Sequence, residues 1–277
     1  MKKIKFDSSW SESWQHSYSH DLLDIYGELN NRGYAYQYEN RRQHTLDLVQ
    51  KIAQPGVKIL DVAAAQGNFS LSLAEFGYEV TWNDLREDLV DYVKLKYEYG
   101  TIYFAPGDVF NLGFNNCFDV VLITEIIEHV AHPDDFLKKV ASLIKPGGYV
   151  VMSTPNGEYF RNRLPRFLDC PDPSQFESIQ FRPDEDGHIF LLHLDEIESL
   201  ACQAGLAIVE TRLFTNPLTR GSLKSEALLK LFPRSWINVV EKWTEHLPLF
   251  LSRKLHLGMA TLLTNRHESI QSSIKYY

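Results

Sequence analysis

The most constraining feature of this sequence is the regular alternation of short apolar runs with helical segments between residues 58 and 153. Runs typical of buried strands cover residues 58–62, 78–83, 101–105, 119–124 and 149–153. Most of these runs are separated by segments with apolar residues at helical spacing. Strands that alternate with helices form a parallel sheet with helices on both faces. The sequence therefore predicts an α/β fold, doubly wound and mostly parallel, with a ligand site at the carboxyl ends of the strands.

Three segments do not follow this alternation. Residues 155–187 are rich in Pro, Arg and Asp and are expected to form a long insertion near the strand ends. Residues 221–252 indicate added helices, and residues 259–264 indicate a last strand after them. The first 50 residues hold two Trp and five Tyr side chains, which either pack on the core or cover a pocket as a lid. We accordingly divide the chain into four parts: an aromatic N-terminal arm or lid (1–50), a core (51–214), a helical insertion (215–257) and a last strand with its tail (258–277).

Charge and composition restrict the classes of partner. The chain has 277 residues and a net charge of −8. Binding to nucleic acid depends on Lys and Arg that neutralise phosphates, so this balance argues against a nucleic-acid partner. Residues 221–277 carry a net charge of +4, which leaves −12 on the first 220 residues. A mildly basic helical tail is most often a solvated face.

Neither a signal peptide nor a membrane span is predicted. The first ten residues contain no apolar run, and the most apolar late stretch, residues 247–263, is interrupted by basic side chains. The three cysteines have neither metal-ligand spacing nor the pattern of a disulfide framework: Cys117, Cys170 and Cys202. We therefore expect a reducing, cytoplasmic setting.

The first connection between a strand and a helix permits close approach of a ligand. Asp61 lies near the end of the strand, and the turn after it consists of Ala63, Ala64, Ala65, Gln66 and Gly67. Short side chains let the backbone approach a bound molecule. Small residues are also common where a helix packs on a strand, so the turn alone does not separate a ligand cradle from a packing site.

Two further carboxylates follow the next strands. Asp84 comes after the second strand, where an acid can accept hydrogen bonds from both hydroxyls of a ribose; the alternative is a surface Asp that caps the next helix. Asp108 follows the third strand, where it either accepts from an adenine amine or shapes a turn.

Five signals thus occur in a fixed order between residues 58 and 154: the turn at 59–67, Asp84, Gly107-Asp108, the apolar run from Phe118 and the run 143–148 before the fifth strand. This set resembles the class I S-adenosylmethionine-dependent methyltransferases. That family usually has glycine where this chain has Ala63 and Ala65. Alanine is strained wherever φ must be positive, so we expect a tighter or differently angled loop.

The resemblance implies a seven-stranded Rossmann-like sheet and S-adenosyl-L-methionine as cofactor. The methyl group would pass from the sulfonium to a nucleophile by in-line displacement, for which alignment in a closed pocket can supply most of the catalysis. The residues implied to contact the cofactor are Asp61, Ala63, Ala64, Ala65, Gln66, Gly67, Asp84, Leu85, Asp108, Val109, Thr124 and Glu125.

A second polar group follows the fourth strand, in the run Glu-Ile-Ile-Glu-His from Glu125 to His129. In a helix, 100° per residue would place Glu125, Glu128 and His129 within an arc of about 100°. Two carboxylates and an imidazole on one face can hold a divalent metal or act as acid and base. We take His129 and Glu128 as candidate catalytic residues; the alternative is a polar pocket wall.

This run resembles a segment of ubiquinone-biosynthesis O-methyltransferases and of small-RNA 3′-end 2′-O-methyltransferases. In these enzymes Glu-x-x-Glu-His and a later His bind a divalent ion. The resemblance implies a magnesium or manganese site at Glu125, Glu128, His129 and His188, with His193 as a second candidate for the last ligand. Similar segments occur in metal-free relatives, so the metal site remains one of two alternatives.

These observations together predict a methyltransferase that acts on an oxygen of a small-molecule, sugar-like or phenolic acceptor. A metal-dependent RNA 2′-O-methyltransferase and a non-catalytic, cofactor-binding assembly protein are the alternatives. A nicotinamide dehydrogenase fits less well because Gly-x-Gly-x-x-Gly is absent. The sequence defines neither the acceptor nor the oligomeric state.

Overall fold

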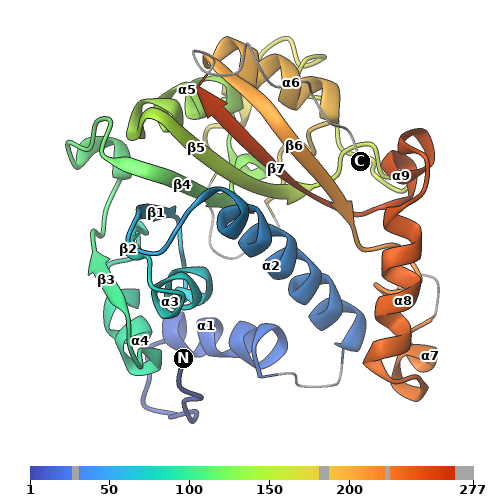
Figure 1. The fold of residues 1–277 in the computed structure, drawn as a ribbon, viewed down its shortest axis with the longest axis horizontal. Helices are drawn as coiled ribbons and strands as arrows, with labels where there is room; N and C mark the ends of the chain where they lie inside the picture. The colour runs from blue at the N-terminus through green and yellow to red at the C-terminus, as the bar shows by residue number, and fades with distance from the viewer. Residues whose placement is uncertain (27–30, 181–186, 222–224, 266–277) are drawn as a thin grey trace.

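A seven-stranded sheet forms the centre of the computed structural model, which describes residues 1–26, 31–180, 187–221 and 225–265 (Figure 1). Its strands are β1 (Lys58–Val62), β2 (Glu79–Trp82), β3 (Thr101–Phe104), β4 (Phe118–Thr124), β5 (Ile144–Pro155), β6 (Leu206–Phe214) and β7 (Gly258–Asn265). They lie in the order β3-β2-β1-β4-β5-β7-β6, and β7, which pairs with β5 and β6, runs opposite to the other six strands. The predicted mostly parallel sheet of seven strands is confirmed.

Helices cover the sheet on both sides. Those in the described residues are α1 (Glu12–Asp24), α2 (Arg32–Ile52), α3 (Asn68–Glu75), α4 (Leu89–Lys96), α5 (Pro133–Leu143), α6 (Leu194–Gln203), α7 (Glu226–Leu231), α8 (Arg234–Glu245) and α9 (Leu249–Leu255). Successive residues of β1 point to opposite faces: Ile59 packs with α2 and α3, whereas Leu60 packs with α5 and α6. This alternation is why strands such as β4 are apolar on both faces.

Local sequence explains several helix boundaries. Pro133 begins α5, two acids follow it in the first turn, and Phe136, Leu137 and Val140 are buried against the sheet. The run 143–148, expected to precede the fifth strand, belongs to that strand except for Leu143, the last residue of α5, because Ile144 already pairs with Phe118 of β4. Among the described residues, no helix combines the length and the hydropathy that a transmembrane span requires.

The first 50 residues form two helices with different neighbours. Trp10 and Trp14 lie edge-on to Tyr92 of α4, with ring centroids 5.9 and 5.6 Å apart. Helix α2 instead packs beside β5 and β7. The aromatic side chains in and just before α1 therefore pack on the protein. Helix α2 passes the carboxyl end of β4, where Arg41 contacts Glu125, and ends at Ile52 shortly before β1 begins.

The helices α7, α8 and α9 lie between β6 and β7, as the sequence predicted for residues 221–252. They stand together at one end of the molecule in Figure 1. Phe214, the last residue of β6, pairs with Gly258, the first of β7. Because Gly258 also pairs with Pro155 at the carboxyl end of β5, this insertion emerges on the side of the sheet where the ligand site is expected.

Candidate active site

The loop between β1 and α3 has three residues in the left-handed region of backbone space. The φ angles of Ala63, Ala65 and Gly67 are +49°, +46° and +72°. Such angles favour glycine, and they cost a residue with a Cβ about 1–2 kcal/mol. At Gly67 a Cβ would also lie 2.8 Å from a methyl group of Val93. The loop thus keeps the conformation that glycine favours even where alanine stands.

Hydrogen bonds hold this loop against the end of β2. The backbone N–H of Ala64 donates to the carbonyl of Asn83 at 2.8 Å, and the N–H of Gly67 donates back to the carbonyl of Ala64 at 2.8 Å. The carboxylate of Asp84 accepts from the N–H of Ala65 at 2.8 Å. Gln66 lies at the tip of the loop and is half-buried. The predicted cofactor loop is therefore a fixed turn at the carboxyl end of β1.

Asp84 is buried, and it is bound on both oxygens. Besides Ala65, it accepts from the backbone N–H of Arg86 at 2.9 Å and from the guanidinium Nε at 3.2 Å. Helix α4 begins after Asp88, so Asp84 does not cap it. Asp84 therefore links the loop to β2 at the position expected for a ribose acceptor.

Asp61 lies fully buried beneath the loop. Its Oδ2 accepts from the hydroxyl of Ser70 at 2.5 Å, whereas Oδ1 has no partner among the described residues. Burial raises the pKa of Asp61 to about 7, against the opposing effect of the Ser70 hydrogen bonds. Buried acceptors normally have a donor, so a donor on a bound ligand or a water would satisfy this oxygen.

A cavity of about 370 Å³ opens beside the loop. Its lining includes four of the predicted cofactor residues: Ala63, Leu85, Asp108 and Val109. The lining also includes Gly107, which the sequence analysis named together with Asp108. The others were not assigned from the sequence: Val62, Asn83, Phe110, Ile126, Val130, His132, Asp135, Phe136, Lys139 and Gln180. Asn83 could have been inferred because it precedes Asp84 in the sequence, whereas Phe136 and Lys139 reach the cavity only because α5 folds over it.

Two of the lining residues also shape the backbone. The amide of Asn83 donates to the carbonyls of Ala105 and Gly107 at 2.7 and 2.9 Å, which fixes the segment after β3. Asp108 accepts from the N–H of Phe110 at 3.1 Å and from the amide of Asn111 at 2.7 Å. Asp108 therefore shapes a turn, and it lines the cavity as well.

The segment after β4 is not an α-helix. Thr124 ends β4, and Glu125 follows with a φ of +53°. Only Ile127–His129 is helical, as a single 3₁₀ turn. The arc that a helix would give to Glu125, Glu128 and His129 therefore does not form, because the φ of Glu125 is positive.

Glu125 is held by partners on two other elements. Its carboxylate accepts from the hydroxyl of Ser153 at 3.0 Å and lies 2.8 Å from the guanidinium of Arg41 on α2. Its N–H donates to the carbonyl of Ser153 at 2.9 Å. Both charged side chains are largely shielded from solvent. Arg41 is thus a residue of this site that the sequence analysis did not assign.

The structure brings Glu128, His129 and His188 together, with one ligand atom of each within 4.8 Å of the others. The rings of His129 and His188 have centroids 4.8 Å apart. The N–H of Ile189 donates to the carbonyl of Glu128 at 2.7 Å, which holds the His188 segment in place. His193 instead caps α6 beside Glu196, so His188 is the histidine that joins the group.

Glu128 is the least solvated member of this group. It is fully buried; Oε2 accepts from the hydroxyl of Thr154 at 3.0 Å, and Oε1 has no partner among the described residues. Burial, and then the neighbouring Glu125 carboxylate, raise the pKa of Glu128 well above its usual range. A carboxylate with an unpartnered oxygen beside two imidazoles suits a divalent cation. Glu125 fits this donor set less well because Arg41 already neutralises it.

The model of a methyltransferase domain family matches residues 34–211, more than half of the chain. The chain belongs to this methyltransferase family. The match spans β1 to β5 and most of β6, so the loop after β1, Asp84 and the Glu128 group all lie within the methyltransferase domain.

Curated relatives of this methyltransferase are similar over part of their length. The ubiquinone biosynthesis O-methyltransferase of Xanthomonas campestris pv. campestris (strain B100) is 31% identical over 144 residues, 48% of this chain and 60% of the relative. That of Coxiella burnetii (strain RSA 493 / Nine Mile phase I) is 32% identical over 157 residues, 49% of this chain and 62% of the relative. The chain thus spans about 60% of the length of these curated relatives.

Solved structures show the same fold at low sequence identity. An S-adenosylmethionine-dependent methyltransferase from Mesorhizobium loti has a TM-score of 0.54 at 15% identity, covering 79% of this chain and 96% of that one. The magnesium protoporphyrin IX methyltransferase of Synechocystis PCC 6803, solved with bound SAH, has a TM-score of 0.54 at 13% identity, covering 91% of this chain and 92% of that one.

Proposed function

We propose that this protein transfers the methyl group of S-adenosyl-L-methionine to an oxygen of a small-molecule acceptor. The observation that carries the proposal is the loop from Ala63 to Gly67, whose backbone is left-handed at Ala63, Ala65 and Gly67. Asp84 holds this loop through the N–H of Ala65, and a cavity of about 370 Å³ lies beside it. That volume is within the range of small-molecule sites. Membership in the methyltransferase family supports the same donor.

The chain offers a separate contact for each part of the donor. The loop and the unpartnered Oδ1 of Asp61 suit the methionine end, and Asp84 suits the ribose. Leu85, Val109 and Phe110 give the cavity an apolar lining that suits the adenine. In the proposed reaction these contacts orient the sulfonium methyl and exclude water, which together can supply most of the rate enhancement.

An acceptor hydroxyl must also lose a proton as its oxygen gains the methyl group. His129 is the candidate base, since a neutral imidazole accepts a proton near neutral pH. Glu128 is buried beside it and orients it or stabilises its charged form. The products are then the methylated oxygen, S-adenosylhomocysteine and a proton on His129.

The cluster of Glu128, His129 and His188 also favours a second candidate, a metal-dependent RNA 2′-O-methyltransferase. A magnesium or manganese ion held there would lower the pKa of an acceptor hydroxyl. The net charge of −8 favours a small acceptor over RNA, because RNA binding requires cationic surface. The ubiquinone O-methyltransferase relatives also support a small acceptor.

Isothermal titration with S-adenosylmethionine tests the donor directly. We expect binding by the wild type and at least about tenfold weaker binding by Asp84→Ala, which removes the proposed ribose acceptor. Asp91→Ala is the matched control, because Asp91 lies exposed on α4 and pairs only with Lys94 in the described structure. A folded wild type that binds no donor would refute the proposal.

An assay of methyl transfer distinguishes a small-molecule acceptor, an RNA acceptor and a protein without transfer activity. The protein is supplied with labelled donor and either a panel of phenols, catechols and sugars or a short RNA, with and without chelator. Transfer to a small molecule supports the main proposal, and chelator-sensitive transfer to RNA supports the second. Tight donor binding without transfer to any acceptor would favour a non-catalytic, cofactor-binding assembly protein.

A further inference from the structure

The helices between β6 and β7 present an apolar face to solvent. On α8, Trp236, Val239, Val240 and Trp243 recur at the three- and four-residue spacing of one helix face, and all four are exposed. The two Trp side chains are 63% and 69% exposed. We call these four residues the α8 face. Large exposed apolar side chains that cluster in this way mark an interaction site.

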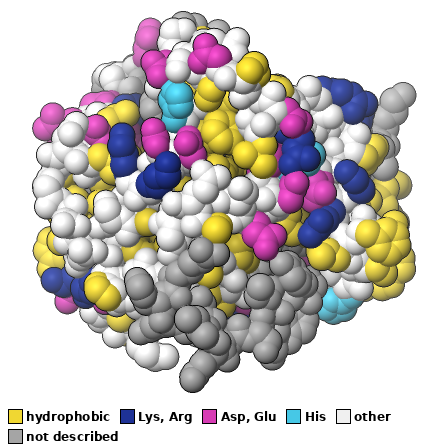
Figure 2. Space-filling view, turned by 90° about the horizontal axis from the view of Figure 1, so that it is seen from above, with side chains coloured by type: hydrophobic (Ala, Val, Ile, Leu, Met, Phe, Trp, Pro, Cys, Tyr) yellow, Lys and Arg dark blue, Asp and Glu magenta, His cyan; other side chains and the backbone are white. Residues whose placement is uncertain are grey.

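Neighbouring side chains extend the α8 face. The ring of Phe232 stacks on Trp236 with centroids 5.9 Å apart, and Leu228 and Leu231 of α7 are exposed beside it in sequence. Phe250 of α9 is exposed as well. Figure 1 places α7, α8 and α9 together, and Figure 2 shows hydrophobic side chains next to Lys and Arg along the same edge of the molecule (right).

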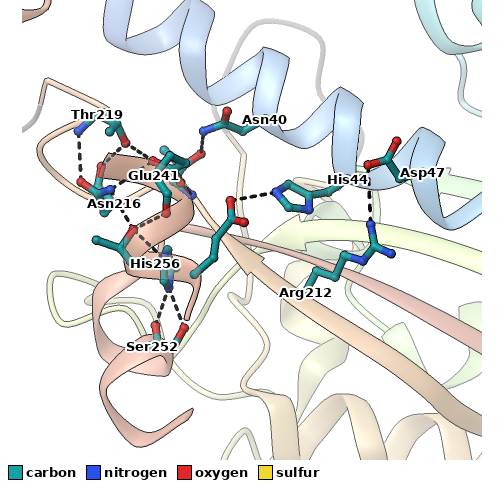
Figure 3. Close-up of polar contacts among 12 residues, drawn as sticks. Asn40, His44, Asp47, Arg212, Asn216, Thr219, Glu241, Ser252 and His256 are labelled. Atoms are coloured by element: carbon teal, nitrogen blue, oxygen red, sulfur yellow. Dashed lines mark hydrogen bonds and ion pairs between the residues drawn. The ribbon is translucent and has the colours of Figure 1, made fainter. Parts of the chain in front are cut away.

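The opposite side of α8 is fixed inside the protein (Figure 3). The carboxylate of Glu241 accepts from the N–H of Thr215, from the amide of Asn216 at 3.1 Å and from the hydroxyl of Thr219. His256 lies against Thr244 at 3.3 Å in the same buried network. Turning the helix over would leave these buried polar groups unpaired, so the α8 face remains directed to solvent.

The helices α7, α8 and α9 carry three exposed lysines, while the exposed carboxylate of Glu39 on α2 is paired with Arg234 of α8. Lys230, Lys242 and Lys254 are exposed, one on each of the three helices. Among the side chains described between residues 225 and 255, the carboxylates are engaged: Glu241 is buried, and Glu245 lies 3.2 Å from His44. This end of the molecule therefore combines exposed apolar and aromatic side chains with three lysines that form no ion pair among the described residues.

We propose that the α8 face docks this protein on an anionic lipid surface. Trp side chains favour the boundary between headgroups and acyl chains, and lysines beside them are attracted to anionic headgroups. Charges farther away than ~8 Å are largely screened at physiological ionic strength, so the acidic remainder of the chain opposes this contact only weakly. Docking through an exposed helical face needs no membrane-spanning segment.

Flotation with phosphatidylcholine vesicles, with and without phosphatidylglycerol, tests the proposal on the full chain. We expect the wild type to float with the anionic vesicles. The double variant Trp236→Ser with Trp243→Ser should bind them at least about tenfold more weakly, because it removes two interfacial anchors. The matched control is Tyr99→Ser with Tyr103→Ser, which removes two aromatic side chains of similar exposure (61% and 56%) near β3. This control should float as the wild type does.

A second set of variants tests the charge. Lys230→Glu, Lys242→Glu and Lys254→Glu together should abolish the preference for phosphatidylglycerol, while circular dichroism and donor titration verify the fold. Failure of the wild type to float, or equal flotation by the Trp double variant, would overturn the proposal. It would also be overturned by a wild-type dimer that the Trp variant converts to a monomer, since the face would then bind a second copy of this chain.

Discussion

The guanidinium of Arg41 lies 2.8 Å from the carboxylate of Glu125, so an N-terminal helix is tied to the carboxyl end of β4. The Glu125 charge raises the pKa of Glu128, and the Arg41 charge opposes that effect. Arg41 therefore neutralises one of two neighbouring carboxylates and leaves Glu128 as the carboxylate of the histidine cluster.

Arg41→Ala should lower the free energy of unfolding by about 1–3 kcal/mol, because it leaves a largely buried carboxylate without its partner. Glu125→Gln alone should also destabilise the protein. In a double-mutant cycle measured by urea unfolding, the two losses should not add. Strict additivity would show that the two side chains do not interact in solution.

Ala63→Gly and Ala65→Gly should each stabilise the protein slightly. Glycine removes about 1–2 kcal/mol of left-handed strain from the folded state. It also gives the unfolded chain more conformational freedom, which lowers stability by about 0.4–1 kcal/mol. The free energy of unfolding should therefore rise by about 0.5–1 kcal/mol. Ala64→Gly is the control in the same loop, because the φ of Ala64 is not positive. It should lower stability in the same urea titration, and equal effects at all three positions would contradict the strain argument.

Asp61 should make stability decrease with rising pH. Its pKa is near 4 in the unfolded chain and about 7 in the folded one, so between these values the folded state binds more protons. The contribution of Asp61 is therefore complete below pH ~4 and is lost as pH rises to 7. Asp61→Asn should remove this dependence and exceed the wild type in stability by about 1–3 kcal/mol at pH 8. A difference in the free energy of unfolding between Asp61→Asn and the wild type that stays constant from pH 5 to pH 8 would contradict the prediction.

Glu241→Ala should destabilise the protein by about 2–4 kcal/mol, because it removes the acceptor shared by three buried donors. Limited proteolysis should then cleave between β6 and β7 faster than in the wild type. Lys242→Ala, at the next and exposed position, should leave both measurements near wild type. Equal protease resistance in Glu241→Ala would refute an anchoring role.

The sheet was predictable because each buried strand is a short apolar run, and such runs are local in sequence. Ala63 and Ala65 were singled out because the resembling family usually has glycine there, but that they adopt the left-handed conformation is visible only in the structure. The backbone at Glu125 was not predictable, because its positive φ depends on Ser153 of the neighbouring strand and on Arg41 of α2. Likewise, the choice between His188 and His193 depends on the hydrogen bond from Ile189 to Glu128, which no spacing reveals.

The pairing of Phe214 with Gly258 also bears on how this fold can diversify. The chain leaves the sheet and re-enters it at directly opposed positions, so the length of residues 215–257 has no influence on strand register. This stretch can be exchanged between homologues, or grafted in the laboratory, without rebuilding the sheet. The surface that we propose for lipid binding can thus change within this one insertion while the loop between β1 and α3 stays constant.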